Sequence, residues 1–414
     1  MIEGLGPGQT GALVLVTTGA FLFRLTLLGA GLPHGPIQGS MLTAFRADLS
    51  GRSVAYERFL IFDDDIWRYL WDGHVWAGGV NPYRFAPQDP AVDGLSDGSG
   101  VWNDIRHSVN HASTPTIYPP LAEGVFRASH WVAPGSVLVM KGVLTGFDML
   151  ACLFVGLALQ QMGRPAVLAV VYAWNPLVIK AFSGSGHVDA LIAASLAACA
   201  YFLIREFRTL ATVTFAAAVL VKMAPLILLP FFARRVGFRY SAAAVALIVA
   251  GYLPFRDAGW HLFTGLLAFG TQWQFNAGPY AAFRMLSAFL FARPDVAARI
   301  LSALAIGAVV VWAAWGDDCR AATFAGISTA VLGFSILLGP VVMPWYIASL
   351  LPLAAISGDR FWGWCSALVS FAFLVMIDGT ERSWALIVEY GILMLALYAS
   401  ERRRRQICWK ENYK

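Results

Sequence analysis

The apolar residues of this chain gather in blocks of roughly 16–24 residues, close to the ~20 that a helix needs to cross a bilayer. The chain of 414 residues is 58% hydrophobic and only 13% charged, whereas soluble domains are about one quarter charged. Disorder is excluded too, because it requires low hydrophobicity and high charge. The sequence therefore predicts an all-α, polytopic transmembrane bundle of roughly 11–13 membrane segments, some of them broken.

Two pairs of blocks are interrupted by residues that helices avoid. The block 209–221 meets 223–233 at Lys222-Met223-Ala224-Pro225, and 321–338 meets 344–357 across Gly339-Pro340 and Pro344-Trp345-Tyr346. Broken backbone at membrane depth is tolerated only inside protein or beside a water-filled cavity. The remaining blocks lie at 11–31, 138–161, 166–182, 188–204, 240–255, 299–316, 361–378 and 384–400.

The arginines of the short loops fall on one side of the membrane in this arrangement, and the run Arg402 to Arg405 follows the last block. Such residues mark the cytoplasmic side. We therefore expect a multi-pass protein of the inner (cytoplasmic) membrane with both termini in the cytoplasm, and no nucleic-acid partner despite the net charge of +5. The expected single membrane domain, 1–414, has two long extracytoplasmic segments, 32–137 and 256–298, and a basic cytoplasmic tail, 401–414.

The first extracytoplasmic segment is far longer than a connector needs to be, and loops beyond about 15 residues are usually functional or disordered. Helix-like, aromatic-rich stretches at 62–77 and 119–132 suit the membrane–water interface. Between them, the pair Pro119-Pro120 fixes an extended entry before a helix. This segment therefore has structure of its own.

The acidic run Asp63-Asp64-Asp65 begins the first of these stretches. Adjacent carboxylates repel one another, so the run has an energetic cost that needs a reason. It has three interpretations: a general base held by Arg68 or Arg84, a site for a hard divalent cation, or a solvated helix N-terminus stabilised by the helix dipole.

Three further groups of residues stand near the membrane surface. The motif Trp174-Asn175-Pro176 precedes Gly186-His187-Val188-Asp189 between two blocks, and function or a satisfied helix cap explains it. Charges inside membrane segments suggest functional sites, with snorkelling to the interface as the alternative. The cations are Arg24, Lys180, Lys222 and Arg284, and the aromatic residues on the same side, which suit sugar stacking or an interfacial belt, are Trp273, Trp345 and Tyr346.

These motifs resemble those of the bacterial polyprenyl-phosphate-mannose-dependent mannosyltransferases, integral membrane glycosyltransferases of the GT-C class. The resemblance rests on Asp64-Asp65-Ile66-Trp67-Arg68-Tyr69-Leu70-Trp71-Asp72-Gly73, on Gly79-Val80-Asn81-Pro82-Tyr83 and on Thr116-Ile117-Tyr118-Pro119-Pro120-Leu121-Ala122. Shorter matches follow at Asn175-Pro176, at His187, at Lys222 with Pro225 and Pro230, and at Pro344-Trp345-Tyr346. The first motif is the most specific.

The resemblance implies a catalytic aspartate in the first extracytoplasmic loop. Alignment of the family's acidic pair makes Asp64 the base with Asp65 beside it, and Asp63 leaves the register open by one residue. The donor's lipid phosphate is expected to bind Arg24, Lys222, His187 and Arg284. The expected substrate-binding residues are Arg68, Tyr69, Asp72, Asn81, Tyr83, Tyr118, Asp189, Trp273, Trp345 and Tyr346.

The implied reaction moves a sugar, mannose or a similar hexose or pentose, from a polyprenyl-phosphate donor to a hydroxyl of a lipid or glycan acceptor on the periplasmic face, with inversion. No cofactor is required, and a divalent metal is not expected because the leaving phosphate needs only cations to stabilise its charge. The partners are the donor, the acceptor and membrane lipids. Three alternatives remain open: a lipid-linked glycan flippase or transporter, a glycan ligase, and an envelope scaffold.

Overall fold

The computed structural model describes residues 7–28, 63–96, 100–315, 324–373 and 383–412. These residues form helices joined by short turns, and the only β-bridge among them joins Phe275 to Val341. The predicted all-α fold is therefore confirmed. Residues 32–62 of the predicted first loop lie outside the described residues, as do the side chains of most of the predicted basic tail.

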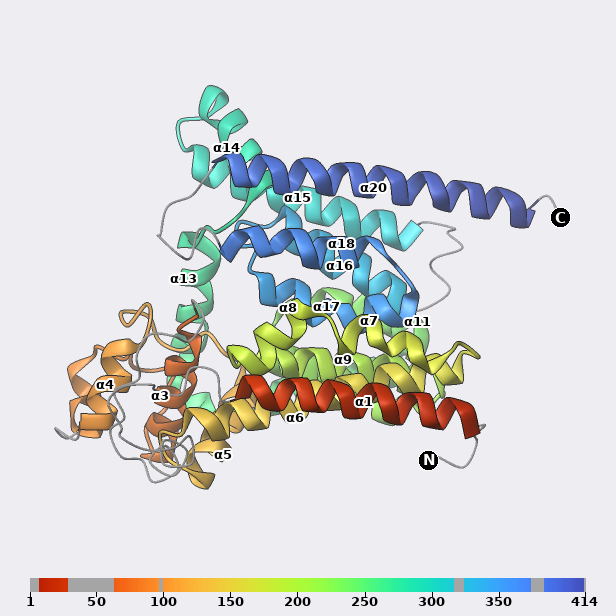
Figure 1. The fold of residues 1–414 in the computed structure, drawn as a ribbon. Coiled ribbons are helices and arrows are strands. Elements are labelled where there is room, and N and C mark those ends of the chain that lie inside the picture. Colours follow the sequence, from red (N-terminus) through yellow and green to blue (C-terminus); the bar gives the residue numbers. More distant parts are fainter. Residues whose placement is uncertain (1–6, 29–62, 97–99, 316–323, 374–382, 413–414) are drawn as a thin grey trace.

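A central group of helices surrounds α9 (Asp189–Ile204), which packs against α6 (Val137–Gln161), α10 (Arg208–Val221) and α17 (Pro344–Ser357). Most of α9 is buried, and many of its buried residues are alanines. Small residues let helix backbones approach closely where lipid offers no hydrophobic driving force between helices. Helix α1 (Pro7–Leu28) lies along α6 on one side of this group (Figure 1).

The second half of the chain adds an outer set of helices whose apolar side chains face outward. On α15, for example, Leu304 and Trp315 are exposed. Large exposed apolar surfaces suit a lipid environment. The set comprises α12 (Phe238–Tyr252), η5 (Leu253–Phe263), α13 (Thr264–Gln272), α14 (Gly278–Leu290), α15 (Pro294–Trp315) and α20 (Ser383–Asn412). The same half also contains α11 (Leu229–Val236), α16 (Phe324–Leu338), α18 (Phe361–Leu368) and η6 (Val369–Phe371), whose apolar side chains are largely buried in the main core.

Three helices in the described residues are long and apolar enough to cross a membrane, or four if one bent pair counts as a span. They are Val137–Gln161, the continuous stretch Phe238–Gln272, and Pro294–Trp315. Further apolar helices of 10–17 residues match most of the predicted blocks. The expectation of roughly 11–13 membrane segments stays a prediction, because many of these helices are shorter than the ~20 residues of a full span.

The chain is broken where the sequence indicated. Helix α10 ends at Val221, Lys222 is extended, and η4 (Ala224–Leu228) follows. A second break separates α16 from α17. A third break follows η2 (Ala166–Ala169) and α7 (Val170–Ala173). After it, the side-chain oxygen of Asn175 accepts from the backbone N–H of Leu177 and so caps α8 (Pro176–Ile179). Helix α8 continues into the π-helical η3 (Lys180–Gly184).

The described part of the first long loop folds over one end of the bundle, opposite the start of α1 and the end of α20 (Figure 1). It contains α3 (Asp65–Ala77), η1 (Pro90–Leu95), α4 (Gly100–Ser108) and α5 (Pro120–Val132), so the predicted helices at 62–77 and 119–132 are present. The ring of Tyr69 stacks on Phe126 and meets Tyr118 edge-on. At Gly73, α3 and α5 come so close that an added Cβ would lie 2.5 Å from the Phe126 carbonyl oxygen.

Candidate active site

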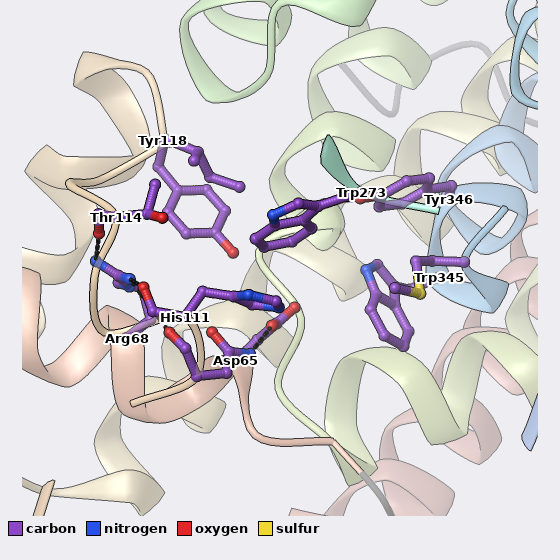
Figure 2. Close-up of a pocket in the computed structure, with 11 residues that line it drawn as sticks. Asp65, Arg68, His111, Thr114, Tyr118, Trp273, Trp345 and Tyr346 are labelled. Atoms are coloured by element: carbon purple, nitrogen blue, oxygen red, sulfur yellow. Dashed lines mark hydrogen bonds between the residues drawn. The ribbon is translucent and has the colours of Figure 1, made fainter. Parts of the chain in front are cut away.

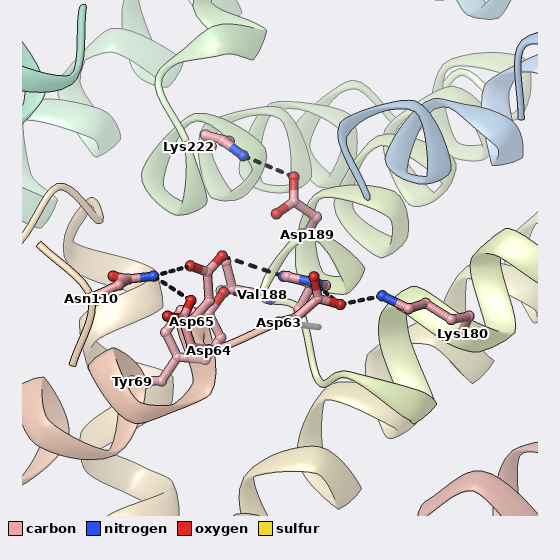
Figure 3. A network of polar contacts seen from close by, with 10 residues as sticks. Asp63, Asp64, Asp65, Tyr69, Asn110, Lys180, Val188, Asp189 and Lys222 are labelled. Atoms are coloured by element: carbon pink, nitrogen blue, oxygen red, sulfur yellow. Dashed lines mark hydrogen bonds and ion pairs between the residues drawn. The ribbon is translucent and has the colours of Figure 1, made fainter. Parts of the chain in front are cut away.

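The acidic run lies where the loop helices meet the broken helices of the bundle. Asp63 and Asp64 immediately precede α3, and Asp65 is its first residue. Side chains from three other segments converge on the run: Asn110 from the turn after α4, Lys180 from η3, and His187 from the turn before α9. Figure 3 shows Asn110 on one side of the three aspartates and Lys180 on the other.

Asp63 is the most enclosed of the three carboxylates, with 1% of its side chain exposed. It forms an ion pair with Lys180, and one of its oxygens lies 3.3 Å from Nε2 of His187. Burial alone would raise the pKa of Asp63, but the charges of His187 and Lys180 outweigh it and hold the pKa below the ordinary value. Asp63 is therefore a paired, ionised group.

Asp64 and Asp65 share one amide. Nδ2 of Asn110 donates to Asp64 at 2.7 Å and to Asp65 at 3.0 Å (Figure 3). Asp64 is exposed, and partial desolvation together with the charge of Asp65 raises its pKa. Asp65 behaves in the opposite way, because His187 lowers its pKa against the effect of burial. The neighbouring carboxylates thus differ in basicity, as expected of groups with separate roles.

His187 lies between two of the aspartates. Its Nε2 is 3.3 Å from Asp63 and its Nδ1 is 3.4 Å from Asp65. The ring stacks on Trp345, with 3.8 Å between centroids and 15° between planes. Burial lowers the pKa of His187, but the two carboxylates more than compensate and raise it above its ordinary value. Sequence analysis expected His187 at the lipid phosphate; the structure places it against the acidic run.

Lys222 stands at the break after α10, where an extended backbone points its side chain toward α9 and α17. Its Nζ lies 2.9 Å from Asp189 and 3.5 Å from the centre of the Tyr346 ring. The side chain is 26% exposed, so its ammonium group has donors left for another anion. Asp189 begins α9, where the helix dipole favours a carboxylate.

A pocket opens beside the acidic run (Figure 2). Arg68 and Thr114 lie at one side of it, and Trp345 and Tyr346 lie opposite. Trp273 lies between these sides and stacks on His111 with 3.8 Å between centroids. The complete lining is Asp65, Arg68, Asn110, His111, Thr114, Ile117, Tyr118, Trp273, Met343, Trp345 and Tyr346. A polar floor between aromatic walls suits a sugar ring, which has polar edges and apolar faces.

Arg68 organises the turn that carries Asn110. Its guanidinium donates to the backbone carbonyl oxygens of Asn110, His111 and Thr114 at 3.0–3.2 Å. Behind it, Asp72 lies 3.8 Å from the guanidinium in a fully enclosed position. Sequence analysis expected Arg68 to hold substrate or the base directly; here it lines the pocket and also acts through the turn.

Several predicted substrate-binding residues are held by packing or by contacts within the loop region instead. Tyr69 is buried in the aromatic cluster, and the hydroxyl of buried Tyr83 donates to the Tyr118 carbonyl at 2.6 Å. Asn81 donates to Asp257 at 2.6 Å and so ties the loop to η5. These residues, with Asp72, do not line the described pocket. Tyr118, Trp273, Trp345 and Tyr346 do line it.

Two of the predicted phosphate-binding cations have partners elsewhere. Arg24 is fully buried, pairs with Asp148 of α6 and donates to the Ala173 carbonyl at 2.7 Å. Arg284 pairs with Asp295 at 2.8 Å on an exposed surface. Neither has a described contact with the acidic run or the pocket lining, so this geometry gives no support to their predicted role. Lys180 takes a place at the site instead, through Asp63.

Asn110 was not predicted from the sequence, because it lies in a turn without any recognisable motif. No group of three or more His, Cys, Asp or Glu side chains in the described ranges is placed to hold a metal ion. The described residues therefore offer no set of ligands for the divalent cation that was one of the three interpretations of the acidic run. The expectation that no metal is required remains a prediction.

Comparison with known proteins agrees with this site. No curated protein matches the chain significantly. Residues 59–237 match the family model described as alpha-(1->6)-mannopyranosyltransferase, N-terminal domain. That span contains the acidic run, Asn110, Lys180, His187 and Lys222. Residues 59–237 thus resemble the N-terminal domain of the alpha-(1->6)-mannopyranosyltransferases, and this match supports the resemblance to bacterial membrane mannosyltransferases.

Proposed function

We propose that this protein transfers a mannosyl residue from a polyprenyl-phosphate donor to a hydroxyl group of a lipid or glycan acceptor, with inversion at the anomeric carbon. The family match supports the sugar. One observation supports the chemistry above all: the cluster of three carboxylates with Lys180 and His187 reaches, through Asp65, a pocket with aromatic walls at the broken end of the bundle.

In this scheme Asp64 is the general base. It is exposed and its raised pKa makes it the better proton acceptor of the run. The acceptor hydroxyl gives its proton to Asp64 while its oxygen bonds to the anomeric carbon. The bond from that carbon to the phosphate oxygen breaks, and its electron pair leaves with the polyprenyl phosphate. Asp65 lines the pocket beside Asp64 and holds the acceptor.

Lys222 is the proposed contact of the donor phosphate. It is partly exposed at a helix break and lies on the Tyr346 ring, beside the pocket that Tyr346 lines. A lysine there stabilises the charge that develops on the leaving phosphate, and no general acid is needed. The pair with Asp189 holds the ammonium group in place before the donor binds.

The proposed setting is the inner membrane, with the site on the periplasmic side. The start of α1 and the end of α20 lie on the same side of the bundle, opposite the loop helices (Figure 1). The arginine-rich run 402–405 belongs to that far end, and such runs favour the cytoplasm. The acidic run at the opposite end then faces the periplasm, where a membrane-bound donor and acceptor meet.

The test is transfer by the purified protein in detergent or liposomes, with polyprenyl-phosphate mannose as donor and mass spectrometry of the product. We expect Asp64→Asn to lose at least about 100-fold in kcat, the usual contribution of a general base. Full activity in both Asp64→Asn and Asp65→Asn would overturn the assignment. Configuration of the product anomer, read by NMR, tests inversion.

The same assay separates the alternatives. A flippase moves its lipid without cleaving it, so acceptor-dependent release of polyprenyl phosphate is expected only from a transferase. A metal-dependent glycan ligase would lose activity with a chelator and would use a lipid pyrophosphate donor. We expect activity to persist in chelator and to depend on the monophosphate donor.

A further inference from the structure

His187 has a carboxylate near each ring nitrogen, at the ion-pair distances of 3.3 Å and 3.4 Å, although neither contact has the geometry of a hydrogen bond. A neutral imidazole has one N–H and so can serve only one of two acceptors; the imidazolium form donates from both nitrogens. Two acidic partners therefore fit a protonated ring. A protonated ring of this kind links Asp63 to Asp65. It has no described contact with Asp64, the residue between them in the sequence.

The ring is held so that it cannot turn away. Only 1% of the His187 side chain is exposed, and one face rests on Trp345. The preceding residue, Gly186, has a φ of +75°, and an added Cβ there would lie 2.9 Å from Cγ of Lys141 and 3.1 Å from Cδ1 of Ile66. The turn before α9 is thus pressed between α6 and α3, which fixes the position of the imidazole.

The charges around the run leave one carboxylate uncompensated. Asp63, Asp64 and Asp65 bring three negative charges, and Lys180 and a protonated His187 bring two positive ones. Asp63 contacts both cations and Asp65 contacts His187, whereas the described contact of Asp64 is the neutral amide of Asn110. The net charge therefore resides on the exposed aspartate.

We propose that His187 is a positioning residue: its imidazolium ties Asp63 to Asp65 and so directs Asp64 outward as the one carboxylate that accepts the acceptor's proton. We call the contacts of His187 with Asp63 and Asp65 the clamp. The clamp is a property of the resting protein, and its effect on catalysis rests on the proposed function. It replaces the expected contact between His187 and the lipid phosphate.

The clamp makes activity depend on pH on the alkaline side. The charged groups around His187 and its turn are Asp63 and Asp65 at the start of α3, Lys180 from η3 and Lys141 from α6. Asp189, which follows the turn at the start of α9, pairs with Lys222. Because the carboxylates raise the pKa of His187, the imidazolium persists above the ordinary value of 6.5 and is lost as the pH rises through the raised value. Beyond that point the ring can serve only one aspartate.

The kinetic test is His187→Gln, assayed over pH for the full-length protein. We expect kcat to fall about 10-fold or more with little change in the donor KM, and the alkaline limb of the wild-type profile to disappear. If His187 bound the donor phosphate instead, the donor KM would rise with kcat preserved, and that outcome overturns the proposal. An alkaline limb that is unchanged in the variant overturns it as well.

The matched control is His130→Gln, a partly buried histidine of α5 outside the pocket, which should keep the wild-type profile. A readout independent of activity is the NMR spectrum of protein labelled with ¹⁵N-histidine. We expect an imidazolium signal that persists above pH 6.5 and is absent in His187→Gln. A His187 signal that titrates below 6.5 overturns the clamp. A persistent signal without any transfer activity leaves the clamp intact and refutes the proposed function.

Discussion

Asn110 donates a 2.7 Å hydrogen bond to Asp64 from a turn that lies 46 residues further along the chain. The same amide reaches the half-buried Asp65, so one neutral group contacts both carboxylates. We expect Asn110→Ala to lower kcat about 10-fold, because a hydrogen bond to a charged group contributes about 1.5–3 kcal/mol and each ~1.4 kcal/mol is tenfold in rate. The measurement is steady-state transfer with polyprenyl-phosphate mannose.

The control for this change is Asn103→Ala on α4, which lies outside the pocket and should transfer at the wild-type rate. Asn110→Asp provides a second test, because it places a further negative charge beside the run and removes the donor. It should lose more activity than Asn110→Ala. Wild-type transfer rates in both Asn110→Ala and Asn110→Asp would show that the Asn110 amide has no part in the reaction.

The acid limb of the pH profile should respond to Asp65. Because the charge of Asp65 contributes to the raised pKa of Asp64, the base is protonated and inactive as the pH falls through that raised value. Neutralising the neighbour in Asp65→Asn lowers the pKa of Asp64. The acid limb of the residual activity should therefore move to lower pH, as measured by kcat/KM across the acid range. A limb that stays fixed or moves upward would contradict Asp64 as the base.

Much of this arrangement could be predicted from local sequence. The apolar blocks gave most helix positions because each block is long, and the breaks at Lys222 and at Gly339 are marked by proline close by. The start of α8 was marked by Asn175-Pro176, since asparagine caps a helix and proline fits its first turn. In each case the residues that predict a helix or a break lie within a few residues of it in the sequence.

The partners of charged residues could not be predicted in the same way. Lys180 and Asp63 are 117 residues apart, and Arg24 and Asp148 are 124 apart. Asp148 lies in an apolar block, and no local pattern links it to Arg24. Tyr69 and Tyr83 were expected to bind substrate because they lie in the motifs that carry the resemblance, whereas their rings are buried in the loop region. Packing decided these positions.

Lys222 should govern donor affinity. Replacement by methionine keeps the length of the side chain and removes the charge that is proposed to meet the phosphate. We expect the donor KM to rise about 10-fold in Lys222→Met, since a charge-assisted contact contributes about 1.5–3 kcal/mol, and Lys222→Arg should recover part of it. Arg239→Gln, an exposed residue of α12, is the control and should leave the KM unchanged. A normal donor KM in Lys222→Met would remove this lysine from the phosphate site.

Arg24 should matter for stability rather than for the donor. Its guanidinium pairs with Asp148 between α1 and α6, and Tyr172 donates to the same carboxylate at 2.7 Å. Removing one partner leaves a buried charge without compensation, which typically costs about 3–5 kcal/mol. We expect Arg24→Met to lower the midpoint of thermal unfolding in detergent, and the double variant with Asp148→Leu to recover part of it. A raised donor KM with unchanged stability would restore the predicted phosphate contact.

Glu123 should make the loop region less stable as the pH rises. The Glu123 side chain is buried beneath α3 and accepts a hydrogen bond from the Thr116 hydroxyl at 2.7 Å. A second carboxyl group, that of Asp72, lies nearby. Burial and the charge of Asp72 raise its pKa well above 4.5, so the folded protein binds a proton that the unfolded chain releases above that value. Stability from this group is therefore complete below about 4.5 and is lost as the pH rises through the folded pKa.

Glutamine at this position keeps the acceptor oxygen for Thr116 and cannot ionise. We therefore expect Glu123→Gln to unfold at a higher temperature than the wild type near pH 8 and at the same temperature below about pH 4.5, where the wild-type carboxyl group is protonated in both states. The measurement is the unfolding midpoint in detergent across that range. Glu206→Gln, at an exposed turn before α10, is the control and should show no such trend. A variant that is less stable than the wild type at pH 8 would mean that Glu123 is ionised and paired in the folded protein.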